Sequence, residues 1–175
     1  MKLLYEFDKH DYDKTMNISH REAVRAIIIR NNKLAMVKSN REGFYKFPGG
    51  GVEKDEGHID ALIRETKEEV GLTVIPETVR EFGYVLERRK STMFKNEIFE
   101  HYSYYYIADI SDDISEQNLD DYEKELEFTL EYVELEKAKE VNTELGQKYY
   151  SDFLLREAKV LEILQEYLKK QVAKK

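Results

Sequence analysis

The chain of 175 residues contains no cysteine and no tryptophan, and it has only two prolines. Without cysteine there can be no disulfide framework, no zinc–thiolate site and no thiol nucleophile. The longest aliphatic run, residues 26–29, is far shorter than the roughly 20 apolar residues that a membrane-spanning helix needs. Residues 1–8 carry charge before the apolar core of a signal peptide could form. These features predict a cytoplasmic protein without a membrane partner.

Positive charge is in deficit, because 28 Lys and Arg residues face 36 Asp and Glu residues and leave a formal net charge of −8 at pH 7. A protein that coats nucleic acid is normally basic, so a nucleic-acid polymer is not an expected partner. Charged residues make up 37% of the chain and hydrophobic residues 41%, a balance that permits a folded core. The length favours a single domain over residues 1–175.

Hydrophobic periodicity predicts strands that alternate with helices. Strands are expected near residues 3–7 and at 21–30, 33–37, 79–88, 97–110 and 128–133. The rest of 1–19 is expected to be irregular, and 111–123 to be an acidic loop. Helices are expected at 58–70, 134–141 and, as an amphipathic C-terminal helix, about 151–172. This order predicts an α/β (α+β) fold with a mixed β-sheet and helices on its faces.

The helix expected at 58–70 carries an acidic face. Glu65, Glu68 and Glu69 are three and four residues apart, so they share an arc of roughly 100° opposite the apolar stripe. Carboxylates this close repel one another, and their oxygens suit hard divalent cations such as Mg²⁺ or Mn²⁺. Arg64 can fix one of them by a planar, charge-assisted bond. Glycines 49–51, just before the helix, leave room for backbone atoms beside a ligand.

A glutamate-rich helix face alone is more often a solvated surface, and a glycine triplet alone is more often a turn. Their joint spacing resembles the Nudix box, G-x5-E-x7-R-E-U-x-E-E-x-G-U with U aliphatic, at Gly50, Glu56, Arg64, Glu65, Glu68, Glu69, Gly71 and Leu72. Thr66 takes the first aliphatic position, and we expect its hydroxyl to bond back to the carbonyl of Leu62. Flanking segments extend the resemblance to about residues 20–145.

The resemblance implies a Nudix-type α/β/α sandwich and a hydrolase that cleaves a nucleoside diphosphate linked to a group X, such as an NTP or ADP-ribose. It also implies Mg²⁺ (or Mn²⁺) bound by Glu65, Glu68, Glu69 and the Gly49 carbonyl. Either Glu65 or Glu68 would take the proton of the attacking water, while Glu56 and Arg64 orient the ligands. An acid from a later loop often completes such sites, and the candidates here are Glu127, then Glu125 and Glu100.

Substrate-binding candidates lie outside the box. Arg25, Lys46 and Arg88 could contact phosphate, although an ordinary surface charge is the commoner role for each. Tyr104, which shares a strand face with Tyr102 and Tyr106, could stack on a base. Packing of that face against a helix is the commoner arrangement.

Two functions remain open from the sequence. The first is the metal-dependent hydrolase, acting on a small nucleotide-type substrate. The alternative is a non-catalytic Nudix-like domain that binds a nucleotide as a regulator. Such domains usually lose charged residues of the box, whereas all of them are present here, so catalysis is favoured. A homodimer is also a possibility, since relatives commonly dimerise.

Overall fold

The computed structural model describes residues 1–173, and its largest layer is a four-stranded sheet. The strands lie in the order β1 (Leu3–Asp8), β7 (Arg80–Lys90), β8 (Glu97–Ile107) and β2 (Asn17–Ile27). β1 and β2 run parallel to their neighbours, whereas β7 and β8 are antiparallel. The sheet is therefore mixed, as the sequence predicts.

A second sheet contains the shorter strands. It has the order β10 (Phe128–Val133), β4 (Lys33–Ser39) and β3 (Ile29–Arg30), with β5 (Tyr45–Lys46) also paired to β4. β6 (Leu72–Val74) and β9 (Ile110–Ile114) form a small antiparallel pair, and η1 (Pro76–Thr78) follows β6 in the chain. The segment between β5 and the next helix runs along β2, since the N–H groups of Ala26 and Val24 donate to the carbonyls of Pro48 and Gly50.

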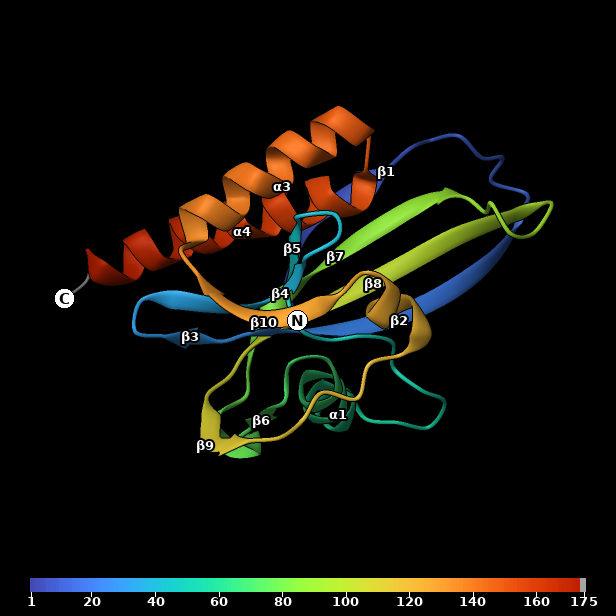
Figure 1. Cartoon of the computed structure of the whole chain (residues 1–175). Coiled ribbons are helices and arrows are strands. Elements are labelled where there is room, and N and C mark those ends of the chain that lie inside the picture. The colour runs from blue at the N-terminus through green and yellow to red at the C-terminus, as the bar shows by residue number, and fades with distance from the viewer. Residues whose placement is uncertain (174–175) are drawn as a thin grey trace.

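Helices cover both sides of the strands (Figure 1). α1 (His58–Val70) lies on one side, and α3 (Leu135–Tyr149) and α4 (Asp152–Val172) lie on the other. Alternate residues of β2 contact the two helical layers, since Val24 clusters with Leu62 of α1, and Ile27 with Leu161 of α4. The predicted order of helix, mixed sheet and helix is confirmed. None of the helices among residues 1–173 has the length and hydropathy needed to span a bilayer.

Several predicted boundaries are corrected by the structure, although α1 has the predicted bounds. The helix expected to end at residue 141 continues to Tyr149, because α4 packs closely against its second half. A Cβ added at Gly146 would lie only 2.9 Å from a methyl carbon of Leu155 on α4. At the other end of the chain, β2 begins at Asn17 rather than Arg21, because β8 supplies its partner along the whole length.

The segment expected to be an acidic loop, 111–123, contains the end of β9 and the start of α2 (Asp121–Glu125). α2 forms because Asp120 and Glu123 make a capping box. The Glu123 N–H donates to Oδ1 of Asp120 at 2.8 Å, and the Asp120 N–H donates to Oε2 of Glu123 at 2.9 Å.

The C-terminal end of α1 is fixed by the same segment. Gly71 ends the helix with φ of 70°, where its N–H donates to the Lys67 carbonyl at 2.9 Å. The Ser115 N–H donates to the Gly71 carbonyl at 2.9 Å, and the Asn118 N–H to the Glu68 carbonyl at 2.8 Å. A Cβ at Gly71 would lie 2.2 Å from the Ser115 carbonyl oxygen, so this close approach requires glycine.

The hydroxyl of Thr66 is unpaired, so the bond expected to the Leu62 carbonyl is not made. Thr66 is fully buried on the apolar stripe of α1, and its Oγ1 has no hydrogen-bond partner within residues 1–173. A buried hydroxyl without a partner destabilises the folded state by about 1–3 kcal/mol.

Replacing this hydroxyl by a methyl group should stabilise the protein. We expect Thr66→Val to raise the free energy of unfolding by about 1 kcal/mol in urea denaturation, because valine has the same shape and needs no partner. Thr143→Val is the matched control, since the Thr143 hydroxyl on α3 donates to the Lys139 carbonyl at 2.7 Å. Equal changes in the two variants would contradict this account.

The side of the four-stranded sheet that faces α4 becomes polar toward one end. There, Nδ1 of the buried His101 lies 3.4 Å from Nη1 of Arg156 on α4. Burial, followed by the positive charges of Arg156, Arg25, Arg21 and Arg89, lowers the pKa of His101 to about 2. The imidazole is therefore neutral in the folded protein, even in mild acid.

This neutral histidine should make stability depend on pH. Between about pH 2 and the ordinary value of 6.5 the unfolded chain binds a proton that folded His101 does not, so stability falls as pH drops below 6.5. We expect the wild type to lose about 1 kcal/mol more than His101→Gln between pH 7.5 and 5.5 in urea denaturation. His10→Gln, at an exposed histidine, is the control and should follow the wild type. Parallel curves for wild type and His101→Gln would refute the prediction.

Candidate active site

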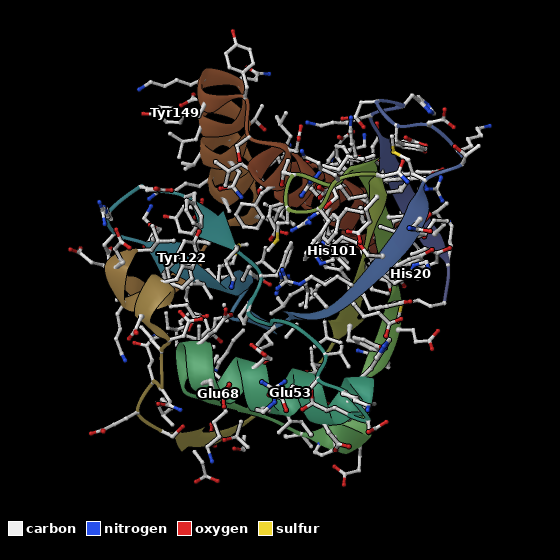
Figure 2. All side chains as sticks on the ribbon, turned by 90° about the vertical axis from the view of Figure 1, so that its right-hand side faces the viewer. His20, Glu53, Glu68, His101, Tyr122 and Tyr149 are labelled. Carbon is white, nitrogen blue, oxygen red and sulfur yellow. The ribbon has the colours of Figure 1, made fainter. Side chains whose placement is uncertain are left out.

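The acidic face of α1 presents its three glutamates to different degrees. The Glu69 side chain is buried, the Glu65 side chain nearly so, and the Glu68 side chain is 37% exposed. Figure 2 shows Glu68 on the ribbon of α1, with Tyr122 of α2 above it. The spacing predicted from the sequence therefore produces one cluster that is open to solvent at Glu68 and closed at Glu69.

Arg64 connects this cluster to the preceding loop. Its Nε and Nη2 donate to the two oxygens of Glu56 at 2.8 and 2.7 Å, and its Nη2 also donates to the Gly51 carbonyl at 3.1 Å. Its Nη1 donates to Glu65 at 2.7 Å and to Glu68 at 3.3 Å. The bonds from Arg64 hold the pKa of Glu56 at about 2, and the Glu56 carboxylate raises the pKa of Arg64. One guanidinium thus orients three carboxylates of the motif.

Glu69 is bound by the backbone and by a buried lysine. The Gly49 N–H donates to its Oε2 at 2.8 Å, and Nζ of Lys46 on β5 pairs with its Oε1. Lys46, predicted to contact substrate phosphate, is itself buried in this ion pair. The structure therefore brings Lys46 into the glutamate cluster, as the partner of a carboxylate.

The glycine loop, residues 49–51, lies directly against Glu65. A Cβ added at Gly50 would be 2.0 Å from Oε2 of Glu65, so any other residue would displace the carboxylate. Burial raises the pKa of Glu65; Arg64 opposes this, and the negative charges of Glu69 and Glu68 add to it. The close approach of Gly50 to the Glu65 carboxylate explains in physical terms why the motif has glycine at its first position.

A fourth carboxylate, Glu123 on α2, approaches the cluster and was missed by sequence reasoning. Burial, followed by the bond to the Glu69 carboxylate, raises the pKa of Glu123 to about 7. The spacing of Asp120 and Glu123, a D-x-x-E capping box, was the local signal of a helix start. It predicts the helix but does not predict that the helix lies beside Glu69.

The three acids predicted to complete the site are bound to partners outside α1. Glu127 is exposed at φ of 54°, and its carbonyl accepts from Nδ2 of Asn40 at 3.0 Å. Glu125 pairs with Arg41 at 2.6 Å, and the buried Glu100 accepts from Nε of Arg88 at 2.7 Å. Within residues 1–173 none of the three makes a hydrogen bond or ion pair with a residue of α1.

Of the remaining substrate-binding candidates, Arg25 comes closest to the cluster. It is buried, and its Nη1 donates to the carbonyl of Gly49, the backbone atom predicted as a metal ligand. Arg88 is far along β7, where it binds Glu6 at 2.9 Å as well as Glu100. The structure therefore joins Arg25, but not Arg88, to the glycine loop.

The side chain of Tyr104, on β8, packs against the first residue of α1. Its ring centroid is 4.4 Å from that of His58, the first residue of the helix, and its hydroxyl donates to Oε1 of Glu22 at 3.2 Å. Tyr106 contacts the same histidine, with 2.8 Å between its hydroxyl and Nδ1. This tyrosine face packs against the beginning of a helix.

The candidate metal ligands of the cluster are all oxygen atoms, and such ligands suit a hard divalent cation. In the present side-chain positions, however, residues 1–173 contain no group of three acidic or histidine side chains arranged to hold one metal ion. Arg64 and Lys46 bind the carboxylates instead. Glu65 and Glu68 both lie within 3.3 Å of Nη1 of Arg64, which shows that they can share one positive group.

Comparison with known proteins agrees with this geometry. Over 97 residues the chain is 34% identical to Nudix hydrolase 2 of Arabidopsis thaliana, covering 52% of this chain and 33% of that protein. Over 55 residues it is 42% identical to the CTP pyrophosphohydrolase of Escherichia coli K12, covering 29% of this chain and 41% of that protein. The chain thus spans less than half the length of either relative.

The fold is also found in solved structures. A NUDIX hydrolase from Nitrosomonas europaea superposes with a TM-score of 0.54 at 14% identity, over 76% of this chain and 90% of that one. The NUDIX domain family model matches residues 19–153, which run from β2 to the end of α3. The chain therefore belongs to the NUDIX family.

Proposed function

We propose that this chain is a hydrolase that cleaves a diphosphate linkage in a small nucleotide, a nucleoside diphosphate linked to a group X. The observation that carries the proposal is the bonding of Arg64 to Glu56, Glu65 and Glu68, since it holds four of the five charged side chains of the motif in fixed relative orientations. The relative named as a CTP pyrophosphohydrolase makes nucleoside triphosphates the first substrates to test.

Enzymes of this family generally depend on a divalent metal ion, and we propose Mg²⁺ here. Glu65, Glu68 and Glu69 would hold it, helped by the Gly49 carbonyl. A divalent cation would neutralise the diphosphate oxygens and acidify an attacking water. Binding of the cation would require Lys46 to release the Glu69 carboxylate and Arg25 to release the Gly49 carbonyl. The free-energy cost of this release is small only if substrate phosphate offers the two side chains replacement acceptors.

The side chains of the protein supply orientation and a proton acceptor. Arg64 fixes the carboxylates of Glu65 and Glu68, while Glu56 holds Arg64 through two parallel bonds. Either Glu65 or Glu68 accepts the proton from water as it attacks phosphorus. The buried Glu69 is less accessible for this role because the Gly49 N–H and Lys46 already bind its two oxygens.

The alternative is a regulatory domain that binds a nucleotide without hydrolysing it. The two functions share the fold and differ in turnover. A panel of NTPs, modified dNTPs, ADP-ribose, dinucleoside polyphosphates and sugar nucleotides, each assayed with Mg²⁺ for phosphate-bearing products, separates them. Binding of a nucleotide without product formation across the panel would favour the alternative.

Removing one carboxylate from the open part of the cluster should abolish most of the activity. We expect Glu68→Gln to lower kcat about 10²-fold or more, since a neutral amide can neither bind a hard cation well nor accept a proton. The measurement is steady-state hydrolysis of the best substrate in the panel. Urea denaturation should show little change in stability, because Glu68 is partly exposed.

Asp60→Asn is the matched control for this variant. Asp60 lies in the first turn of the same helix, is exposed and belongs to no part of the proposed site. It should retain wild-type kcat. Glu69→Gln is a poorer test, because it leaves Lys46 buried without its carboxylate and should cost about 3 kcal/mol of stability. Unchanged turnover in Glu68→Gln would overturn the site assignment.

A pair of variants decides which acid outside the motif belongs to the site. We expect Glu123→Gln to lower kcat about tenfold or more, because Glu123 contacts Glu69, and Glu127→Gln to stay within about twofold of the wild type. Glutamine is acceptable at the third helical position, so α2 should persist. The reverse order of effects would restore Glu127 as the contributing acid.

A further inference from the structure

The strand that carries Lys46 is held along its second edge by the C-terminal helices. β5 is only two residues long and pairs with β4 along one edge. Within residues 1–173 its other edge pairs with no strand and lies next to α3 and α4 (Figure 1). The N–H and C=O groups of a strand edge need hydrogen-bond partners when they are buried. Here the partners are side chains of the two helices.

Asn142 on α3 binds both backbone groups of Tyr45. Its Oδ1 accepts from the Tyr45 N–H at 2.9 Å, and its Nδ2 donates to the Tyr45 carbonyl at 2.7 Å. The N–H and C=O of one residue point to the same edge of a strand, so the amide takes the place of a neighbouring strand. Asn142 is fully buried, and these two bonds are therefore closed to water.

Glu157 on α4 adds the next bond along this edge. Its Oε2 accepts from the Phe47 N–H at 2.9 Å, two residues beyond Tyr45 and so on the same edge. Its Oε1 accepts from the Tyr105 hydroxyl at 3.2 Å and lies 3.7 Å from Nη2 of Arg156. Glu157 is fully buried, where a carboxylate without such partners would be strongly destabilising. No step of the proposed hydrolysis uses this buried acid.

The three bonds from the helices bracket the lysine of the glutamate cluster. Lys46 lies between Tyr45 and Phe47 in the chain. Its Nζ pairs with Oε1 of Glu69, and the Gly49 N–H donates to the other oxygen of that carboxylate at 2.8 Å. The bonds from α3 and α4 thus fix the backbone on both sides of Lys46, and a shift there would move both groups that bind Glu69.

We propose that Asn142 and Glu157 are positioning residues of the active site, which hold Lys46 and the Gly49 peptide against the cation-binding carboxylates. Both act through backbone bonds to β5 and to the residue that follows it. Because the Gly49 carbonyl is among the proposed metal ligands, loosening of β5 should weaken cation binding. Glu157 lies in α4, beyond residues 19–153 that the family model matches. The inference rests on the proposed function, to which it adds the C-terminal helices.

Two variants of Glu157 separate its bond to Phe47 from its ion pair with Arg156. Glu157→Gln and Glu157→Met both remove the negative charge, and both new side chains are close to glutamate in size. Only glutamine retains an oxygen that can accept from the Phe47 N–H. The effect of the lost ion pair is common to both variants, so the difference between them measures the bond to the backbone.

The first measurement is amide hydrogen exchange, followed by NMR on the whole chain without added metal. We expect the Gly49 N–H to exchange about tenfold faster in Glu157→Met than in the wild type, and within about twofold of the wild type in Glu157→Gln. A bond with only a local role would change exchange at Phe47 and leave Gly49 protected by Glu69. Unchanged exchange at Gly49 in Glu157→Met would overturn the inference.

The second measurement is Mn²⁺ binding, by calorimetry on the whole chain without substrate. We expect binding about tenfold weaker in Glu157→Met, and within about twofold of the wild type in Glu157→Gln. A purely structural role would lower the urea midpoint of both variants and leave the Mn²⁺ affinity of the folded protein unchanged. Equal Mn²⁺ affinity in Glu157→Met and the wild type would therefore contradict the inference.

Asn142→Leu repeats both measurements from α3 and removes no charge, so it should fold even if the Glu157 variants do not. It should change Gly49 exchange and Mn²⁺ affinity in the same direction as Glu157→Met. Gln165→Leu is the matched control. Gln165 on α4 accepts from Nζ of Lys139 at 2.8 Å and donates to Glu136 at 2.9 Å, and within residues 1–173 it makes no hydrogen bond to β5. An equal loss in Gln165→Leu would trace the effect to undocking of the helices and overturn the inference.

The outcome is separable from that of the proposed hydrolase. Exchange at Gly49 is measured without metal or substrate, so it decides the inference even if no nucleotide of the panel is hydrolysed. A wild type that binds no Mn²⁺ contradicts the proposed metal site. Hydrolysis of a panel substrate by the wild type, together with unchanged Mn²⁺ affinity in Glu157→Met, contradicts the inference alone.

Discussion

The neutralisation of closely spaced carboxylates by Arg64 and Lys46 is the interaction on which the centre of the molecule depends. The helical repeat of α1 brings Glu65, Glu68 and Glu69 onto one face, where repulsion between their charges destabilises the helix. Arg64 binds two of them together with Glu56, and Lys46 binds the third. Because the latter pair is buried, loss of either partner would leave an uncompensated charge inside the protein.

Close backbone contacts place these charges. The glycine loop approaches Glu65 so closely that a side chain at Gly50 would overlap its carboxylate. At the C-terminal end of α1, residues 115–118 bind the carbonyls of Glu68 and Gly71. The same segment leads into α2 and so sets Glu123 beside Glu69. The middle and the C-terminal end of the helix are therefore held by chain segments that also carry parts of the candidate site.

The sequence was sufficient where structure is determined by local spacing. The bounds of α1 and the orientation of its acidic face follow from residues within a few positions of one another. The position of Glu123 does not, because it depends on bonds between residues 115–118 and the end of α1, which local patterns do not encode. The same holds for α3, whose second half is stabilised by contact between Gly146 and Leu155 on another helix. The unpaired hydroxyl of Thr66 was equally invisible, since an intrahelical bond was sterically allowed but not made.

The net charge of −8 conceals a separation of charge across the sheet. On the α1 side carboxylates outnumber Arg64 and Lys46, whereas Arg25 and Arg156 lie buried on the α4 side, together with Glu157. Gly49 stands between them, because its N–H donates to Glu69 and its carbonyl accepts from Arg25. The two polar groups of Gly49 thus connect a carboxylate of the candidate site with a buried guanidinium. A cation that binds the Gly49 carbonyl must therefore compete with the guanidinium of Arg25 for the same oxygen, and this competition couples the buried arginine to the candidate site.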